Sequence, residues 1–370
     1  MDRLIDEIVQ VSVSDAVAAA TPTSVNTVAV LGVSTKAGAA DVSVKYSQQE
    51  VEDEYDSDDY ASDLSKTTRS FFLEGDNPGR LVCVKTAEAP TAASIASVLE
   101  SALSAGKDSD GNEIDFYHVV IRFGAGTTAA SVIALIEGDS EHEGLEDWCV
   151  ENFRLAHVEL SDRSVAEAVL DGLSKAPTRV AVYFHDESTG KSLAAALVAD
   201  RCGNDPARGT WAHKNLASVV ADATSKTELV RAGNKGLNVY VKIAGVERTY
   251  FGTVGNGASY IDSVVKKDWL RFRTQEAIFD ILGSANGGDG VDYNDSGIAA
   301  VAAAITDIFT TAQDNDHRYV LPDSFDVSVP KYADIPAEDK AKRNLPDVKA
   351  TFSIQESIHT VKTVELQVVA

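Results

Sequence analysis

A glycine-lysine-serine turn is the first place in this sequence where chemistry could take place. Gly190, Lys191 and Ser192 follow an apolar run at residues 179–184 and precede an alanine-rich helical run. A phosphate-binding loop has this context, because its backbone N–H groups and its lysine surround the phosphates. Such a loop needs a glycine five residues before Gly190, where this chain has His185 followed by two acidic residues. We expect a tight strand-to-helix turn; the alternative is a nucleotide-binding α/β enzyme that uses this turn.

Two acidic segments could bind cations. Residues 292–297 place oxygen-bearing side chains at alternate positions and a glycine sixth, like the start of an EF-hand loop, but Ala303 stands where the bidentate glutamate should be. We expect a helix N-cap there, provided by Asp295 or Ser296. Residues 46–60 are rich in Asp and Glu. They predict a solvated acidic loop or helix face, because a cation site needs several oxygens to converge on one point.

No catalytic or metal-binding set follows from residue spacing. The 7 histidines show neither HxxxH nor HxH spacing, and the 3 cysteines are far apart without a CxxC pair. The glycine-rich segment 252–257 lacks the order of a dinucleotide-binding fingerprint and predicts a hairpin turn. We therefore expect no enzymatic activity, no cofactor and no bound metal.

Four cationic residues are grouped on a predicted helix at residues 261–282. They are Lys266, Lys267, Arg271 and Arg273, and they flank Trp269. Such a run is most often a solvated helix face. The alternative is an electrostatic contact with an acidic partner surface.

The composition excludes several classes of protein. The chain has 370 residues, 44% of them hydrophobic, which is enough for two or three domains with a sizeable core. Its formal net charge of -24 argues against nucleic acid and against anionic membrane surfaces as direct partners. The sequence has no apolar run long enough to span a membrane and no signal-peptide core, so we expect a soluble chain made in a cytoplasm.

The order of predicted elements indicates an α/β fold. Between residues 26 and 203, apolar β-rich runs alternate with helical patterns, which predicts βαβ units and a mostly parallel sheet. After residue 225 the pattern changes to short strands and two long helices, of which the second has a regular apolar stripe from Ile298 to Phe309. This C-terminal part reads as α+β. Further runs predict a strand at 325–329 and a charged helix at 336–343.

Both ends of the chain read as short strands with one apolar face. Apolar residues alternate with polar ones at Val9, Val11 and Val13, and again at Val364, Leu366 and Val368. Neither strand has a neighbour in sequence to pair with through a short turn. We expect each to add to a sheet edge elsewhere, as an arm that links subunits.

The chain resembles the tail sheath proteins of contractile-tailed phages and related contractile injection systems. The early matches include an aromatic residue that closes a helix at 71–75 and the proline turn and strand at 78–84. Trp211 lies in a segment similar to the family's TWxxK motif. The other matching segments, in the same order as in the family, are 60–64, 237–240, 252–257, 261–262, 268–270, 293–298, 341–343 and 358–359.

The resemblance implies a structural protein. Sheath subunits stack in rings around an inner tube and contract to drive that tube through the target cell envelope. The partners implied are other copies of the chain, the inner tube protein, and baseplate and tail terminator proteins, in a virion tail. The cationic residues Lys266, Lys267, Arg271 and Arg273 then become candidates for contact with the tube. A surface-layer protein of a salt-adapted cell is a further alternative.

The resemblance and the patterns together predict four parts. Residues 1–20 are a linking arm, and residues 21–205 an α/β domain whose middle, 90–205, is the more variable part. Residues 206–350 are a C-terminal α+β domain, and residues 351–370 a strand arm.

Overall fold

An eight-stranded sheet is the centre of the molecule. The computed structural model describes residues 24–57, 63–86, 88–186, 190–255, 257 and 259–360. The strand order is β2-β3-β1-β4-β5-β6-β7-β8. Strands β1 to β7 are parallel except β2, and the edge strands β2 and β8 run antiparallel to their neighbours. The strands are β1 (Val28–Val33), β2 (Val42–Lys45), β3 (Leu81–Thr86), β4 (His118–Phe123), β5 (Leu155–Leu160), β6 (Val180–Phe184), β7 (Asn238–Ile243) and β8 (Val246–Tyr250).

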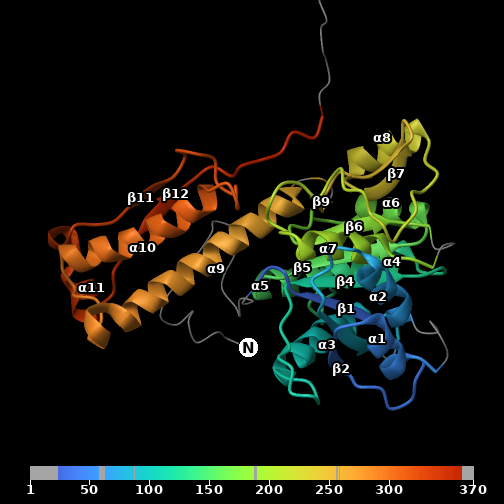
Figure 1. Ribbon diagram of the computed structural model, residues 1–370, viewed down its shortest axis with the longest axis horizontal. Coiled ribbons are helices and arrows are strands. Elements are labelled where there is room, and N and C mark those ends of the chain that lie inside the picture. Colours follow the sequence, from blue (N-terminus) through green and yellow to red (C-terminus); the bar gives the residue numbers. More distant parts are fainter. Residues whose placement is uncertain are drawn as a thin grey trace, which may run out of the picture.

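Helices cover both faces of this sheet (Figure 1). Val28 and Val30 of β1 face one core, and Ala29 and Leu31 face the other, because side chains alternate across a strand. A strand buried on both faces is apolar throughout, which explains the continuous apolar runs. The first core is covered by α1 (Gln48–Tyr55), α2 (Asp63–Leu73) and α7 (Leu193–Gly203). The second is covered by α3 (Ala92–Ala105), α4 (Ala129–Glu137), α5 (Leu145–Asn152), α6 (Arg163–Gly172) and α8 (Lys226–Lys235).

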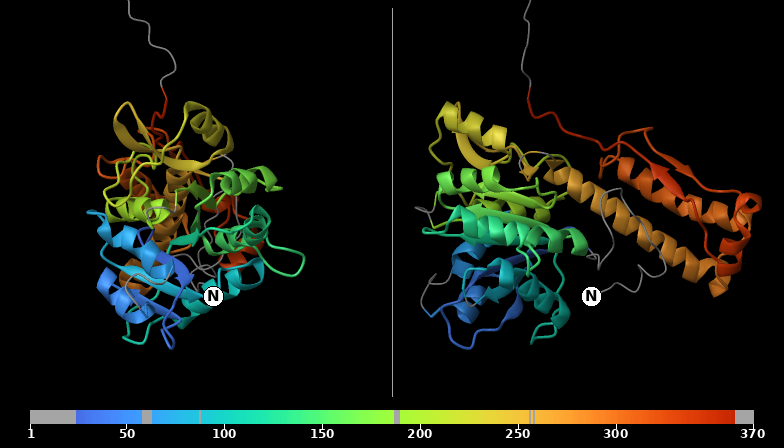
Figure 2. Two further views of the ribbon diagram at one scale, coloured as in Figure 1. Left: turned by 90° about the vertical axis from the view of Figure 1, so that its right-hand side faces the viewer. Right: turned by 180° about the vertical axis from the view of Figure 1, so that it is seen from behind.

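A helical hairpin extends away from this α/β body (Figures 1 and 2). It consists of α9 (Ile261–Ser284) and α10 (Asp295–Gln313), which pack along each other. The 24 residues of α9 correspond to a length of about 36 Å at 1.5 Å per residue. Its first half is buried against the body, whereas Phe279 and Leu282 near its far end are exposed.

A small ribbon lies along the hairpin and leads the chain back to the body. Strands β11 (Asp326–Ser328) and β12 (Lys349–Thr351) pair antiparallel, with Val327 opposite Ala350. The short helix α11 (Ala337–Lys342) lies between them in sequence. After β12, the chain returns to the body, where the Gln355 N–H donates to the Tyr319 carbonyl at 2.8 Å.

The structure confirms the α/β fold class and most predicted elements. The glycine-rich segment forms the predicted hairpin, with β9 (Thr253–Val254) paired to β10 (Ser259–Tyr260). Residues 193–203 form the alanine-rich helix. Gly203 is needed where that helix ends, because a Cβ there would lie 1.0 Å from the Asp76 carbonyl oxygen.

Several boundaries differ from the predictions. The sheet does not end at residue 205, where we placed the domain boundary, because β7 pairs with β6 and β8 extends the sheet to Tyr250. The helix α10 is capped by Asn294, whose side chain accepts from Gly297 N–H, and not by Asp295 or Ser296. Part of the predicted C-terminal arm, from residue 351 to 355, pairs within its own chain. The predicted arm strands at Val9–Val13 and Val364–Val368 lie outside the described residues.

Candidate functional site

The edge of the main sheet at β2 is covered by a loop of the same chain. The Val44 N–H, on this edge strand, donates to Asp108 Oδ2 at 2.9 Å. Burial opposes ionisation of Asp108, but hydrogen bonds from Asn112, Val44 and Asp110 outweigh it and lower its pKa. A carboxylate that occupies an edge N–H prevents another strand from pairing there.

The opposite edge, at β8, is also covered by a loop of the same chain. The His213 N–H donates to the Thr249 carbonyl at 2.7 Å, and the Thr249 N–H donates to the Lys214 carbonyl at 2.9 Å. The Asn215 side chain donates to the Glu247 carbonyl at 3.1 Å. Loop 213–215 therefore occupies backbone groups that an incoming strand would need.

The edges of the ribbon β11–β12 differ from those of the main sheet. In the described part of the chain, these two strands pair only with each other. Val327 and Ala350 face the hairpin core, where Phe309 stacks near Phe325 and Phe352 with ring centroids 5.4 and 5.1 Å away. The outward positions, Asp326, Ser328, Lys349 and Thr351, are exposed. The ribbon thus combines a fixed apolar face with strand edges that can accept further strands.

The segment after β12 is attached firmly to the body. Lys266 Nζ donates to the Gln355 carbonyl at 2.8 Å and to Asp262 Oδ2 at 2.6 Å. Thr210 Oγ1 lies 2.7 Å from His359 Nε2, and the ring of Tyr260 packs against the His359 ring. This segment is therefore held on the body of its own chain as far as residue 359.

These contacts correct the prediction for the cationic helix. Lys266 is fully buried, and Arg271 is 2% exposed with its guanidinium carbon 3.9 Å from the Phe153 ring centroid. Lys267 and Arg273 are half-buried. Successive helix residues point about 100° apart, so one sequence cluster is divided between the buried and outer faces. Lys266 and Arg271 are not available at the surface of this subunit.

A buried ion pair fastens α9 to the sheet. Arg179, at the start of β6, donates through Nη1 and Nη2 to the two carboxylate oxygens of Asp268, at 2.6 and 2.7 Å. Tyr117 O–H donates to Asp268 Oδ2 at 2.5 Å. The spacing of residues did not predict this ion pair; the only signal in the sequence was an aspartate next to Trp269 on the buried half of the helix.

Two histidines lie buried in the sheet. His118 Nδ1 is 3.0 Å from His157 Nε2, and His157 Nδ1 is 2.9 Å from the Tyr183 hydroxyl. The Trp211 ring stacks on His157. Burial lowers the pKa of His118 to about 3, and burial together with His118 lowers the pKa of His157. Both rings are therefore neutral, and these two hydrogen bonds satisfy three of their four ring nitrogens.

The Gly190 turn is a strand-to-helix connection, as predicted. Ser192 is the N-cap of α7, and its Oγ accepts from the Ala195 N–H. The carboxylate of Glu159 occupies the helix N-terminus, where it accepts from Ala194 N–H at 2.6 Å and from Ser192 Oγ at 2.9 Å. A helix N-terminus attracts phosphate by its N–H groups and dipole, and Glu159 already uses both. This arrangement argues against the nucleotide-binding alternative.

The acidic segments have structural roles. Asp295 Oδ1 accepts from Tyr332 N–H at 2.7 Å, and Glu54 on α1 accepts from Ala40 N–H at 2.8 Å. Within the described ranges, no three His, Cys, Asp or Glu side chains are arranged to hold a metal ion. None of the described helices is both long and apolar enough to cross a membrane.

The overall fold, an α/β body joined to a projecting helical hairpin and a two-stranded ribbon, is similar to that of chains in solved structures. The chain matches one from the anti-feeding prophage (AFP) baseplate, 6-fold symmetrised, with a TM-score of 0.61, 12% identity, and coverage of 98% of this chain and 97% of the other. It matches a chain of the AFP helical sheath in the contracted state with a TM-score of 0.60, 13% identity, and coverage of 98% and 97%.

A third match, to the AFP baseplate in the contracted state, has a TM-score of 0.58, 12% identity, and coverage of 92% of each chain. No family model matches the sequence, and no curated protein matches it. The shared fold therefore rests on three-dimensional arrangement over nearly the whole chain.

Proposed function

We propose that this chain is the structural subunit of a contractile sheath. It polymerises in rings around an inner tube and contracts to drive the tube through a target envelope, as part of a virion tail or of a cell-encoded injection device. Its partners are other copies of itself, the inner tube protein, and baseplate and terminator proteins. The sheath-like fold over nearly the whole chain supports this proposal.

The observation that carries the proposal is the contrast between the strand edges. Both outer strands of the main sheet are covered by loops of their own chain, whereas β11–β12 pairs only with itself in the described residues. A terminal arm of a neighbouring subunit would add to this ribbon through main-chain hydrogen bonds, worth about 0.5–1.5 kcal/mol each. The predicted strands at Val9–Val13 and Val364–Val368 have the length and alternation for this role.

The C-terminal segment has two parts with different roles in this proposal: the first is attached to its own body, and the second would link subunits. Lys266 and Thr210 hold the chain to its own body as far as His359, so a linking arm would begin only after that point. Subunits could then rotate against one another during contraction while a short arm keeps them connected. Contraction would need no catalyst, because two packings of the same subunits can differ in free energy.

A subunit restricted to the ring next to a baseplate is the second candidate. Two of the matched chains belong to baseplate structures. Such a subunit would form single rings, whereas a sheath subunit would extend into long cylinders.

Electron microscopy of the purified chain tests the proposal. We expect cylinders of the full chain, and soluble folded subunits without cylinders after deletion of residues 1–20 or 361–370. The matched control is a change of Val9 and Val11 to Ile, which keeps the apolar face and should preserve assembly. Single rings would favour the baseplate role. A full chain that remains monomeric at high concentration would contradict the proposal.

A further inference from the structure

The chain after Gln355 is attached to the body mainly through the side chain of His359. Residues 356, 357, 358 and 360 are exposed, and Ile358 is 84% exposed. His359 is half-buried: Thr210 Oγ1 lies 2.7 Å from its Nε2, and the Tyr260 ring meets its ring edge-on with the centroids 4.7 Å apart. Attachment of this segment therefore depends on the state of one imidazole.

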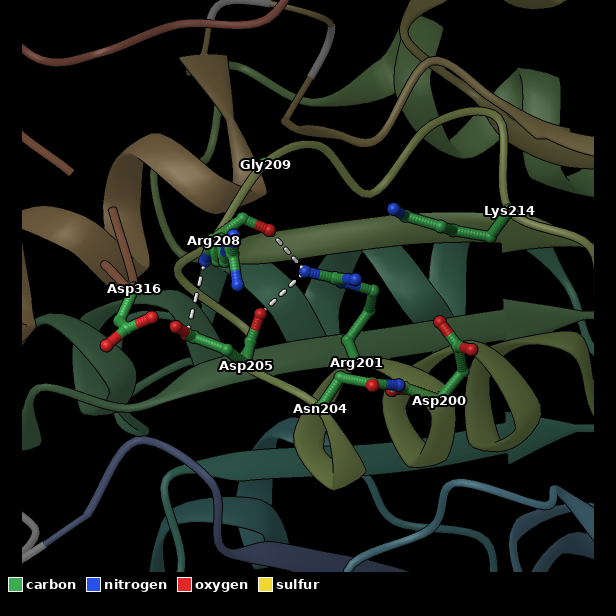
Figure 3. A pocket seen from close by; sticks show the side chains of 8 residues that line it. All are labelled: Asp200, Arg201, Asn204, Asp205, Arg208, Gly209, Lys214 and Asp316. Carbon is green, nitrogen blue, oxygen red and sulfur yellow. Dashed lines mark hydrogen bonds between the residues drawn. The ribbon is translucent and has the colours of Figure 1, made fainter. Parts of the chain in front are cut away.

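A second histidine, His213, faces His359 from a fixed loop. Its Nε2 donates to the His359 carbonyl at 3.2 Å, and the two rings are nearly perpendicular with centroids 5.8 Å apart. The loop that carries His213 is fixed beside α7, because the Arg201 guanidinium donates to the backbone carbonyls of Asp205 and Arg208 (Figure 3). A change at His359 would therefore move the C-terminal segment and not the loop.

The surroundings of His359 favour its neutral form. Burial lowers its pKa, and the charges of His213 and Lys266 lower it further. Asp262 and Glu356 oppose this shift, but Asp262 is already paired with Lys266 Nζ at 2.6 Å and Glu356 is exposed. Further charged groups near the segment are Arg208 and Arg318, which line the adjoining cavity of about 150 Å³ together with Glu356.

Proton uptake by His359 should therefore favour detachment of the segment. In a detached segment the ring would be in water, where the pKa of a histidine is about 6.5. As pH falls below that value, the detached state binds a proton more readily than the attached one. The ratio of detached to attached chains then rises by up to about tenfold per pH unit. Protonation of His213 would add repulsion between the two rings.

We propose that His359 is an acid-sensitive clasp, which holds residues 356–360 on their own body at neutral pH and releases them in acid. Gln355 stays attached, because its hydrogen bonds to Tyr319 and Lys266 do not involve His359. Release frees five residues, which span about 17 Å when extended. That this lengthens a linking arm rests on the proposed function, whereas the release itself is a property of the single subunit.

Distances between two nitroxide labels on one subunit test the release. The labels are attached at Ile358→Cys and at Asn234→Cys, an exposed site on α8, and the labelled chain is diluted with unlabelled chain. The three native cysteines are buried, so the label reacts at the introduced ones. We expect one narrow distance distribution at pH 7.5 and a second, broad one at pH 5.5. The ratio of the broad to the narrow population should be about tenfold higher at the lower pH.

A second label pair shows whether the change is local. Ser353→Cys, combined with the same α8 site, places the label before Gln355 and should give one narrow distribution at both pH values. That result also shows that the body stays folded at pH 5.5. Broadening of both pairs alike would mean general unfolding and would overturn the clasp.

Variants without a titrating ring identify His359 as the sensor. His359→Gln can keep the hydrogen bond to Thr210, and His359→Phe can keep the ring contact with Tyr260. Whichever is attached at pH 7.5 should remain attached at pH 5.5. The matched control, His142→Gln, removes a histidine from an exposed turn elsewhere and should respond like wild type.

The NMR titration of the His359 ring gives a measurement that does not depend on these variants. Its midpoint in the wild-type chain should lie below 6.5. A midpoint at or above 6.5, a broad population that does not grow at pH 5.5, or equal growth in an attached His359 variant overturns the clasp.

The outcomes separate the clasp from the proposed function. Failure of the release leaves the sheath proposal standing, because strand addition does not require it. A chain that releases residues 356–360 in acid but never polymerises keeps the clasp and overturns the sheath subunit.

Discussion

Arg179 and Asp268 form a bidentate ion pair between the start of β6 and the middle of α9, with both N···O distances below 2.8 Å. Both side chains are nearly buried, at 10% and 4% exposed. The pair joins the projecting hairpin to the body at a point where Tyr117 supplies a third hydrogen bond. A force applied to the hairpin is therefore transmitted to the sheet through a charged contact shielded from solvent.

We expect the loss of either partner of this pair to lower the free energy of unfolding strongly. Asp268→Asn should lower the free energy of unfolding by about 3–5 kcal/mol, because it leaves the Arg179 charge buried and uncompensated. Tyr117→Phe should cost less, about 1.5–3 kcal/mol, since it removes one hydrogen bond to a charged group. Urea unfolding of the purified chain measures both.

The control for this prediction is a partly exposed pair on the same helix. Arg273 and Glu276 are 32% and 37% exposed, so Glu276→Gln should change stability by no more than about 1 kcal/mol. Equal losses for Asp268→Asn and Glu276→Gln would contradict the anchoring role.

Acid should destabilise the fold through the two buried histidines. Their pKa values are lowered in the native state, so below pH 6.5 the unfolded chain binds protons that the native chain does not. For His118, stability then rises with pH between about 3 and 6.5, by up to about 1.4 kcal/mol per pH unit. His157 adds to this rise below pH 6.5. Unfolding of wild type and of His118→Gln with His157→Gln, compared at pH 7.5 and 5, should show a shallower pH dependence in the variant.

The pH dependence of stability that His185 contributes should have the opposite sign. Burial lowers its pKa, but the hydrogen bond to Asp222 and the charges of Glu159 and Asp222 outweigh burial and raise it. The protonated ring therefore contributes stability that is fully present below pH 6.5 and is lost as pH rises through the raised pKa. His185→Gln should cost more stability at pH 6 than at pH 9. A loss that is the same at both pH values would show that the charge of His185 does not matter.

Nucleotide binding should be absent. Glu159 occupies the N-terminus of α7 and already accepts the hydrogen bonds that a phosphate would need there. Millimolar ATP with magnesium should leave the thermal midpoint unchanged, and Lys191→Ala should behave like wild type. An ATP-dependent rise in the midpoint that Lys191→Ala abolishes would revive the nucleotide-binding alternative.

Contact with an inner tube stays a prediction for the two outer cations of α9. Lys267 and Arg273 are the members of the cluster that are not buried. Lys267→Glu with Arg273→Glu should leave the fold intact and weaken assembly around tubes, since it would oppose an acidic tube surface. Normal sheaths around tubes, seen by electron microscopy, would place the contact elsewhere.

The sequence by itself determined the local elements. Alternating strand and helix patterns predicted the α/β body, because strands buried on both faces must be apolar throughout. The stripe from Ile298 to Phe309 predicted α10, and the glycine-rich segment predicted the β9–β10 hairpin. The segments that resemble the sheath family, which occur in the family's order, also predicted the sheath-like fold.

Only the tertiary structure decided which surfaces are free. The four cations of α9 look alike in sequence, but packing against the body buries Lys266 and Arg271. Asp108 reads as part of a polar turn, and only the fold brings it to the β2 edge. Glu159 reads as one polar residue in an apolar strand, yet it fills the N-terminus of α7. The physical reason is the same in each case: periodicity shows which face of an element is apolar, whereas its covering partner is distant in sequence.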